Sequence, residues 1–199
     1  MRVCLITCLL ALLAGPQTQI PQNGNPAVET YAEPEAYAVY GALLPSNRVW
    51  GGWFTKSDSL IIQQETEGDR RRPECFPSLT GPREAWAEAL ADYKKENQTP
   101  RLFVRAFPIE KPYVLVPKLR IGDSFKAKGW DSFYDRYPQS GGLIHLSAVG
   151  FNADKTKALV YIAHYCGSLC GIESYVYLEK QGGKWVATTL GDPTCGMIF

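Results

Sequence analysis

The sequence lacks the motifs of the common hydrolases and nucleotide-binding proteins. It contains no Gly-x-Ser-x-Gly turn, no His-Glu-x-x-His helix and no glycine-rich phosphate loop. Only two histidines, His145 and His164, occur in 199 residues, so any histidine-dependent catalysis must use one of them. These absences favour a non-enzymatic function over an enzyme.

The sequence also has little net charge. Its 21 Lys and Arg residues balance 20 Asp and Glu residues, which gives a formal net charge of +1. Such a balance provides no electrostatic footprint for nucleic acid or for an anionic membrane surface. The local basic run Arg70–Arg72 lies among acidic residues, a pattern typical of a solvated loop. We therefore expect no nucleic-acid partner, and the ligand stays open between a small molecule and a protein.

Long apolar segments are absent beyond the N-terminus. There, Val3–Leu13 is apolar except for Thr7, follows Arg2 and precedes Ala14. This segment is too short to span a bilayer and is typical of a secretory signal peptide. The sequence therefore predicts a signal peptide over residues 1–19, a flexible leader over 20–29 and a single domain over 30–199. The expected location is secreted or periplasmic.

Four of the six cysteines remain after removal of the signal peptide. They are Cys75, Cys166, Cys170 and Cys195, an even number in an oxidising compartment. Four cysteines allow three pairings. A short hairpin can bring Cys166 and Cys170 within bonding distance, which leaves Cys75 to pair with Cys195. We favour this pairing over the two others.

Apolar periodicity predicts two or three helices and several strands. The spacing predicts helices over 34–44 and over about 82–96, and a short turn or helix over 130–137. In the second helix, Ala85, Trp86, Ala89, Leu90 and Tyr93 form an apolar stripe. Strands are predicted over 48–55, 60–66, 101–107 and 112–117, each bounded by turn residues or proline. Glu65 and Glu67 share one strand face beside the charged loop, where exposure to solvent is their expected state.

From Leu143 onward the apolar period becomes two, which predicts a four-strand antiparallel meander. The expected strands are 143–151, 158–166, 172–179 and 184–190, with a tight turn at Gln181–Gly183. Placing Phe151 opposite Ala158 predicts that His145 faces His164. One sheet face is then apolar and carries Val149, Phe151, Val160, Ile162, Val176 and Leu178. The other face carries Leu159 and four tyrosines, Tyr161, Tyr165, Tyr175 and Tyr177, which either pack under the helices or form a binding surface.

The meander also carries a resemblance. The run LSAVGFNADKTKALVYIAHYCGSLCG, followed by LEKQGGKW, resembles a group of secreted bacterial proteins of uncharacterised function. The similarity covers roughly Trp130–Val186. It implies an exported bacterial domain and transfers no activity. The ending Thr194–Phe199 departs from the group, so the role of Cys195 does not come from the resemblance.

One corner of the predicted meander combines side chains that bind metals or react. In the expected register, His145, His164 and Cys166 share one end of a sheet face, and Cys170 lies across the turn. Imidazole and thiolate are ligands that zinc prefers, so these three residues form a candidate metal site. His145 and His164 are also the candidate catalytic residues, and Cys166 with Cys170 is a candidate redox pair. A structural disulfide beside two ordinary histidines is the favoured interpretation.

Taken together, these patterns predict an α+β fold in which two or three helices pack on a mainly antiparallel sheet. The specific architecture expected is a helix cradled by a curved sheet, as in cystatin-like or NTF2-like folds; fold analogy transfers no function. The predicted function is non-enzymatic binding of a small molecule, a peptide or an envelope component by an exported soluble domain. No cofactor is predicted. The alternative is an exported redox or metal-dependent enzyme that uses His145, His164, Cys166 and Cys170.

Overall fold

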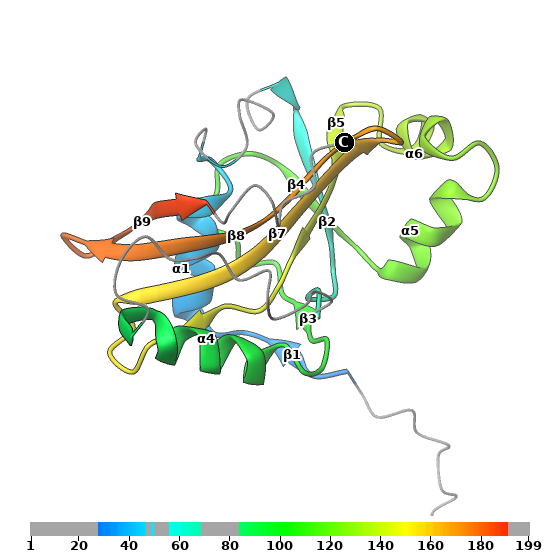
Figure 1. The fold of residues 1–199 in the computed structure, drawn as a ribbon. Coiled ribbons are helices and arrows are strands. Elements are labelled where there is room, and N and C mark those ends of the chain that lie inside the picture. The colour runs from blue at the N-terminus through cyan, green and yellow to red at the C-terminus, as the bar shows by residue number, and fades with distance from the viewer. Residues whose placement is uncertain (1–27, 47–48, 50–55, 69–83, 191–199) are drawn as a thin grey trace, which may run out of the picture.

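A mixed sheet lies at the centre of the structure (Figure 1). The computed structural model describes residues 28–46, 49, 56–68 and 84–190. In this part, strands join in the order β4-β2-β5-β7-β8-β9, and β6 also pairs with β7. The bounds are β2 (Ser59–Gln63), β4 (Tyr113–Val116), β5 (Ser140–Leu146), β6 (Gly150–Phe151), β7 (Lys157–Gly167), β8 (Cys170–Gln181) and β9 (Lys184–Leu190). Two short strands, β1 (Thr30–Tyr31) and β3 (Leu102–Phe103), pair separately in parallel.

Helices lie against both faces of this sheet (Figure 1). They are α1 (Pro34–Leu43) on one face, with α4 (Glu84–Glu96), α5 (Lys118–Phe125) and α6 (Trp130–Arg136) on the other. The predicted α+β class is confirmed. The described residues form four helices where two or three were predicted, because α5 was missed. The cystatin-like or NTF2-like architecture is not confirmed, since helices cover both faces of a mixed sheet.

The sheet is antiparallel only in its C-terminal half. β2 pairs in parallel with both β4 and β5. A parallel pair requires a long crossover connection, and helices fill those connections here: α4 lies between β2 and β4, and α5 and α6 lie between β4 and β5. The predicted strands over 60–66 and 112–117 exist, but their pairing makes the sheet mixed. The strand predicted over 48–55 falls almost entirely outside the described residues.

The predicted meander is confirmed. β7 pairs antiparallel with β8 over nearly its whole length, and β8 pairs with β9. Gln181 pairs with Lys184, so Gly182 and Gly183 alone make the turn. Their φ angles of 56° and 79° lie in the left-handed region that a two-residue type I′ hairpin turn requires and that glycine adopts at little cost.

The main core lies between the sheet and α1. Tyr37, Tyr40 and Leu43 of α1 are at most 5% exposed and face the sheet. The sheet side of this core contains all six residues predicted for the apolar face: Val149, Phe151, Val160, Ile162, Val176 and Leu178. Alternating side-chain direction along each strand therefore determines this face, as the sequence pattern indicated.

The opposite face is covered in part by α4. Trp86, Ala89 and Tyr93 are buried there, as the predicted stripe requires. Close approach depends on Gly150 of β6, because a Cβ at that position would lie 2.3 Å from the Tyr93 backbone nitrogen. Glycine is thus the residue that lets the α4 backbone rest directly on the strand.

The first strand of the meander is interrupted. β5 pairs Leu146 with Ile162, whereas β6 pairs Gly150 with Leu159. The intervening segment 147–149 holds three residues, one more than the two that it opposes on β7. This is a β-bulge, and it divides the predicted strand 143–151 into β5 and β6.

Ser147 replaces part of the lost strand pairing with its own side chain. Its hydroxyl accepts a hydrogen bond from the Tyr161 backbone N–H at 2.8 Å and donates one to the Ala148 carbonyl at 2.8 Å. The Ser147 carbonyl accepts from the Tyr40 hydroxyl at 2.6 Å. Burial raises the pKa of Tyr40 well above its ordinary value, so this hydroxyl keeps its proton and acts as a donor.

Backbone groups of Ala148 and Val149 bond to residues of two other segments. Asn97, just after α4, donates from Nδ2 to the Ala148 carbonyl at 3.0 Å and accepts from the Ala148 N–H at 2.8 Å. The Val149 N–H donates to the Tyr31 hydroxyl at 2.9 Å. Because the bulge is at most 1% exposed, water does not replace these partners.

We expect the variant Asn97→Ala to lose about 2 kcal/mol of unfolding free energy, because the buried Ala148 N–H then lacks its partner, while the Ala148 carbonyl keeps its hydrogen bond from the Ser147 hydroxyl. The measurement is urea unfolding followed by circular dichroism. Gln98→Ala, at an exposed neighbouring position, is the matched control. Equal stability of the two variants would contradict the proposed support of the bulge.

Candidate functional site

The two histidines lie on opposite faces of the sheet. β5 and β7 pair His145 with Ala163 and Ile144 with His164. Consecutive residues of a strand point to opposite faces, so the imidazoles do not meet. The prediction that His145 faces His164 is wrong.

The bulge explains this error. The predicted register starts from Phe151 opposite Ala158, and that pair is present. Counting back from it at two residues per repeat omits the extra residue in segment 147–149. A register shift of one residue exchanges the two faces of a strand, which is what separates the histidines.

Cys166 and Cys170 form the predicted disulfide, with 5.0 Å between their Cα atoms. The bond closes the β7–β8 hairpin, and the Tyr134 hydroxyl of α6 donates to the Cys166 carbonyl at 3.0 Å. The Cys166 sulfur is therefore bonded to the Cys170 sulfur and is not available as a metal ligand. Because His145 and His164 also lie on opposite faces, the three predicted metal ligands do not converge. The described part of the chain holds no group of three or more His, Cys, Asp or Glu side chains placed to bind a metal ion.

His164 is 4% exposed on the face of α1. Its Nε2 lies 2.8 Å from the Gly141 carbonyl, so Nε2 carries the proton and donates. Burial lowers the pKa of His164, and the hydrogen bond to Gly141 offsets only part of that effect. The neutral imidazole is thus a hydrogen-bonded part of the core, and this is a structural role.

The tyrosines predicted as a binding surface are Tyr161, Tyr165, Tyr175 and Tyr177. Three of them lie under α4, at 7%, 2% and 2% exposure for Tyr161, Tyr175 and Tyr177. Trp86 meets Tyr177 edge to face with 4.7 Å between ring centroids, and Tyr93 meets Tyr175 at 5.7 Å. Burial raises the pKa of Tyr177. Packing under a helix therefore accounts for these three rings, and a role in binding stays a prediction.

A band of polar side chains crosses the same face, between the apolar contacts of α4 and those of α5 and α6. We call it the polar band, and it comprises Gln63, Glu67, His145, Tyr161, Tyr165 and Glu173. Glu67 is 5% exposed, so the expectation that it is solvated is wrong. It accepts from Gln63 Nε2 at 3.0 Å and lies 3.2 Å from His145 Nδ1.

The other end of the polar band is Glu173 of β8, which is 6% exposed. One carboxylate oxygen accepts from the Tyr161 hydroxyl at 2.9 Å, and the other accepts from the Tyr165 hydroxyl. The Tyr165 ring stands edge to face against the His145 ring at 5.3 Å. The band thus runs as one contact chain from Gln63 to Glu173.

The arrangement at His145 resembles that of an oriented base. A carboxylate beside Nδ1 fixes the ring and leaves Nε2 as the second nitrogen available for chemistry. That Nε2 is buried and has no hydrogen-bond partner within the described part of the chain. Since the atom is shielded from solvent, a substrate would need a rearrangement to reach it, and the geometry alone does not make His145 catalytic.

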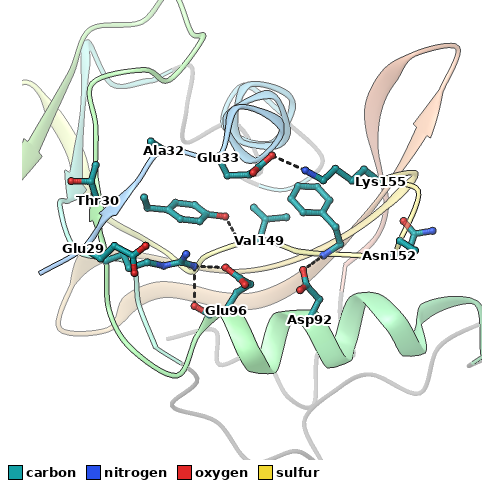
Figure 2. A pocket seen from close by; sticks show the side chains of 13 residues that line it. Glu29, Thr30, Ala32, Glu33, Asp92, Glu96, Val149, Asn152 and Lys155 are labelled. Carbon is teal, nitrogen blue, oxygen red and sulfur yellow. Dashed lines mark hydrogen bonds and ion pairs between the residues drawn. The ribbon is translucent and has the colours of Figure 1, made fainter.

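An open groove lies between β1, α4 and the β6–β7 turn (Figure 2). Its volume is about 540 Å³, a size suited to one small ligand. Its floor consists of Tyr31, Val149 and Phe151, which are 3%, 1% and 8% exposed. The groove therefore combines an apolar, largely aromatic floor with an opening to solvent.

Ion pairs mark two sides of this groove (Figure 2). Arg101 donates to the Glu96 carboxylate at 2.7 Å and to the Glu96 carbonyl at 3.0 Å, and Lys155 pairs with Glu33 at 2.8 Å. Burial by itself would raise the pKa of Glu96, but the hydrogen bond and charge of Arg101 outweigh it and lower that pKa. The hydrogen bond to Glu33 raises the pKa of Lys155.

The backbone of the floor is held in place from both neighbouring elements. The Val149 N–H donates to Tyr31, and the Phe151 N–H donates to Asp92 Oδ2 of α4 at 2.9 Å. A binding surface built on such fixed backbone requires little ordering when a ligand arrives. The bulge therefore gives the groove a rigid floor.

Sequence analysis did not find this groove. Its lining comes from residues 29–33, 92–101 and 149–155, three segments that no local motif connects. The only signal was the Phe-Asn-x-Asp-x-Thr turn at 151–156, which the resemblance included without a role.

Comparisons of the chain with protein-family models, with curated proteins and with solved structures found no match. The resemblance of the C-terminal part to secreted bacterial proteins stays a prediction. Among the described residues, no helix has the length and apolar character needed to cross a bilayer.

We expect His164 to titrate below its ordinary pKa of 6.5 in NMR spectra of the imidazole, because burial disfavours the charged ring. A depressed folded-state pKa means that the unfolded chain binds protons more readily. The stability due to neutral His164 is therefore present above about pH 6.5 and is lost as the pH falls below it. His164→Gln, which retains a donor for Gly141, should flatten this part of the stability profile; titration at or above pH 6.5 would contradict the interpretation.

Cys75 and Cys195 lie outside the described residues, so their pairing stays a prediction. Peptide mapping without reductant should recover Cys166 linked to Cys170. Replacing both with serine should lower the unfolding free energy by about 2 kcal/mol, the loop-closure contribution of so small a ring. Ser168→Ala, in the same hairpin tip, is the control. Recovery of Cys166 linked to another cysteine would contradict the structure.

Proposed function

We propose that this chain is an exported, non-enzymatic binding domain and that the groove beside β1 takes a small molecule or a short peptide. An envelope component that presents such a group would be an equivalent ligand. The observation that carries the proposal is the groove itself: about 540 Å³ above the buried side chains of Tyr31, Val149 and Phe151. Ligand sites usually combine apolar side chains with fixed polar groups in one concave surface, and this groove has both.

Export rests on the N-terminal sequence. The apolar segment Val3–Leu13 predicts a signal peptide, and a disulfide between Cys166 and Cys170 fits an oxidising compartment. Secretion or periplasmic location, and bacterial origin, are part of this proposal. The whole signal segment falls outside the described residues.

The alternative, an exported redox or metal-dependent enzyme, has less support. It requires His145, His164, Cys166 and Cys170 to act together, whereas the two histidines occupy opposite faces. Among the described residues, the His145–Glu67 pair is the arrangement that favours catalysis, and the buried Nε2 of His145 is closed to solvent. The groove, in contrast, is already open.

The substitution Ala32→Trp should test the groove without disturbing the core, because Ala32 is exposed and lines it. We expect a panel of small amines, carboxylates and neutral diols to include at least one that shifts amide resonances of groove residues in ¹⁵N NMR spectra. Ala32→Trp should abolish those shifts by filling the groove. Ala38→Trp, at an exposed position of α1 outside the groove, should retain them. Shifts located elsewhere, or none for any probe, would reject the proposal.

A further inference from the structure

We propose that the ligand of this groove is a linear α,ω-diamine, an alkyl chain with an ammonium group at each end. This inference rests on the proposed binding function and specifies the ligand. Three observations support it: the charge of the lining, the position of its two carboxylates that form no ion pair, and the apolar floor between them.

The lining is acidic although the whole chain is not. Four carboxylates line the groove, from Glu29, Glu33, Asp92 and Glu96, against two cations, Arg101 and Lys155. The difference is a net charge of −2, compared with +1 for the complete sequence. A ligand with two positive charges would neutralise the groove, whereas an anionic ligand would be repelled.

Two of the four carboxylates are available to such a ligand. Glu33 pairs with Lys155 and Glu96 with Arg101. In the described part of the chain, Glu29 and Asp92 form no ion pair. Asp92 accepts one backbone hydrogen bond through Oδ2, which leaves acceptor capacity for an ammonium group.

Glu29 and Asp92 stand apart from each other, with Val149 between them in the view of Figure 2. Glu29 directly precedes β1, whereas Asp92 belongs to α4, where its carboxylate accepts the Phe151 N–H. A ligand that bridges them must cross the apolar floor. A hydrocarbon chain suits that floor, because it removes apolar surface from water without leaving a polar group unpaired.

The aromatic rings of the floor already contact cations. The Arg101 guanidinium lies 4.4 Å from the Tyr31 ring centroid, and Lys155 Nζ lies 5.6 Å from that of Phe151. Ring faces attract positive charge through their quadrupole. Tyr31 and Phe151 thus hold the two cations of the lining, and the carboxylates of the lining, not these buried rings, select the charge sign of the ligand.

The test compares four ligands of equal chain length by isothermal titration calorimetry in 50 mM salt: 1,5-diaminopentane, pentylamine, pentane-1,5-diol and glutarate. We expect 1,5-diaminopentane to bind about two- to fivefold more tightly than pentylamine, the effect of one further partly exposed ion pair. Glutarate should not bind. Raising the salt to 500 mM should reduce the preference for the diamine.

Two variants test whether Glu29 and Asp92 each bind one ammonium group of the diamine. Glu29→Gln and Asp92→Asn should each reduce the affinity for 1,5-diaminopentane to that for pentylamine, and Asp92→Asn retains an acceptor for the Phe151 N–H. Glu110→Gln removes one exposed carboxylate outside the groove and should leave the affinity unchanged. Thermal unfolding of each variant checks that the fold is retained.

The outcomes separate this inference from the function on which it rests. Equal affinities for diamine and monoamine, or for the Glu29 and Asp92 variants and the wild type, would overturn the diamine proposal. Binding of the diol or of glutarate that Ala32→Trp abolishes would also overturn it, while supporting a binding groove. Failure of every probe, in both this series and the wider panel, would reject the groove as a binding site.

Discussion

Three buried residues whose backbone departs from regular strand pairing, 147–149, are the constraint on which the structure depends. Each of their polar groups would be costly to leave without a partner. Ser147 still bonds Tyr161 of β7, and the other partners come from outside the sheet: Tyr40 from α1, Asn97 from the end of α4 and Tyr31 from β1. One irregular turn of chain thereby fixes the helices on both faces of the sheet relative to one another. These hydrogen bonds connect the sheet to α1 and α4, which otherwise contact the sheet through apolar side chains.

The same bulge determines where chemistry is found. Because of the bulge, His145 and His164 lie on different faces, so the predicted cluster of these histidines with Cys166 does not form. It also places Val149 in the floor of the groove, with its backbone bonded to Tyr31. On the sheet face below α4, His145 joins Glu67 in the polar band instead. One additional residue in the strand therefore separates the predicted metal ligands. The same residue contributes to the rigid floor of the groove and to the position of His145 in the polar band.

Sequence patterns correctly predicted the elements that depend on interactions between residues close together in the chain. The period of two identified β7 to β9, the Gly182–Gly183 turn and the apolar face, and the spacing of Trp86, Ala89 and Tyr93 identified α4. Gly122 weakens the pattern of α5, which contributes few buried residues and was missed. The bulge could not be predicted, because its partners lie 107 residues away for Tyr40 and 51 for Asn97. The groove and the burial of Glu67 also depend on long-range contacts, such as that between Glu67 and His145, which are 78 residues apart.

The strand order also implies a sequence of events in folding. The meander β7-β8-β9 pairs neighbours along the chain, so its loop-closure entropy is small. β2 must instead pair with β5 across the whole length of α4, α5 and α6, with Ser59 opposite Ser140. The N-terminal strands therefore join a sheet whose C-terminal half can already exist. Because Gln63 and Glu67 arrive with β2, the Glu67 carboxylate would keep its water until β2 joins β5.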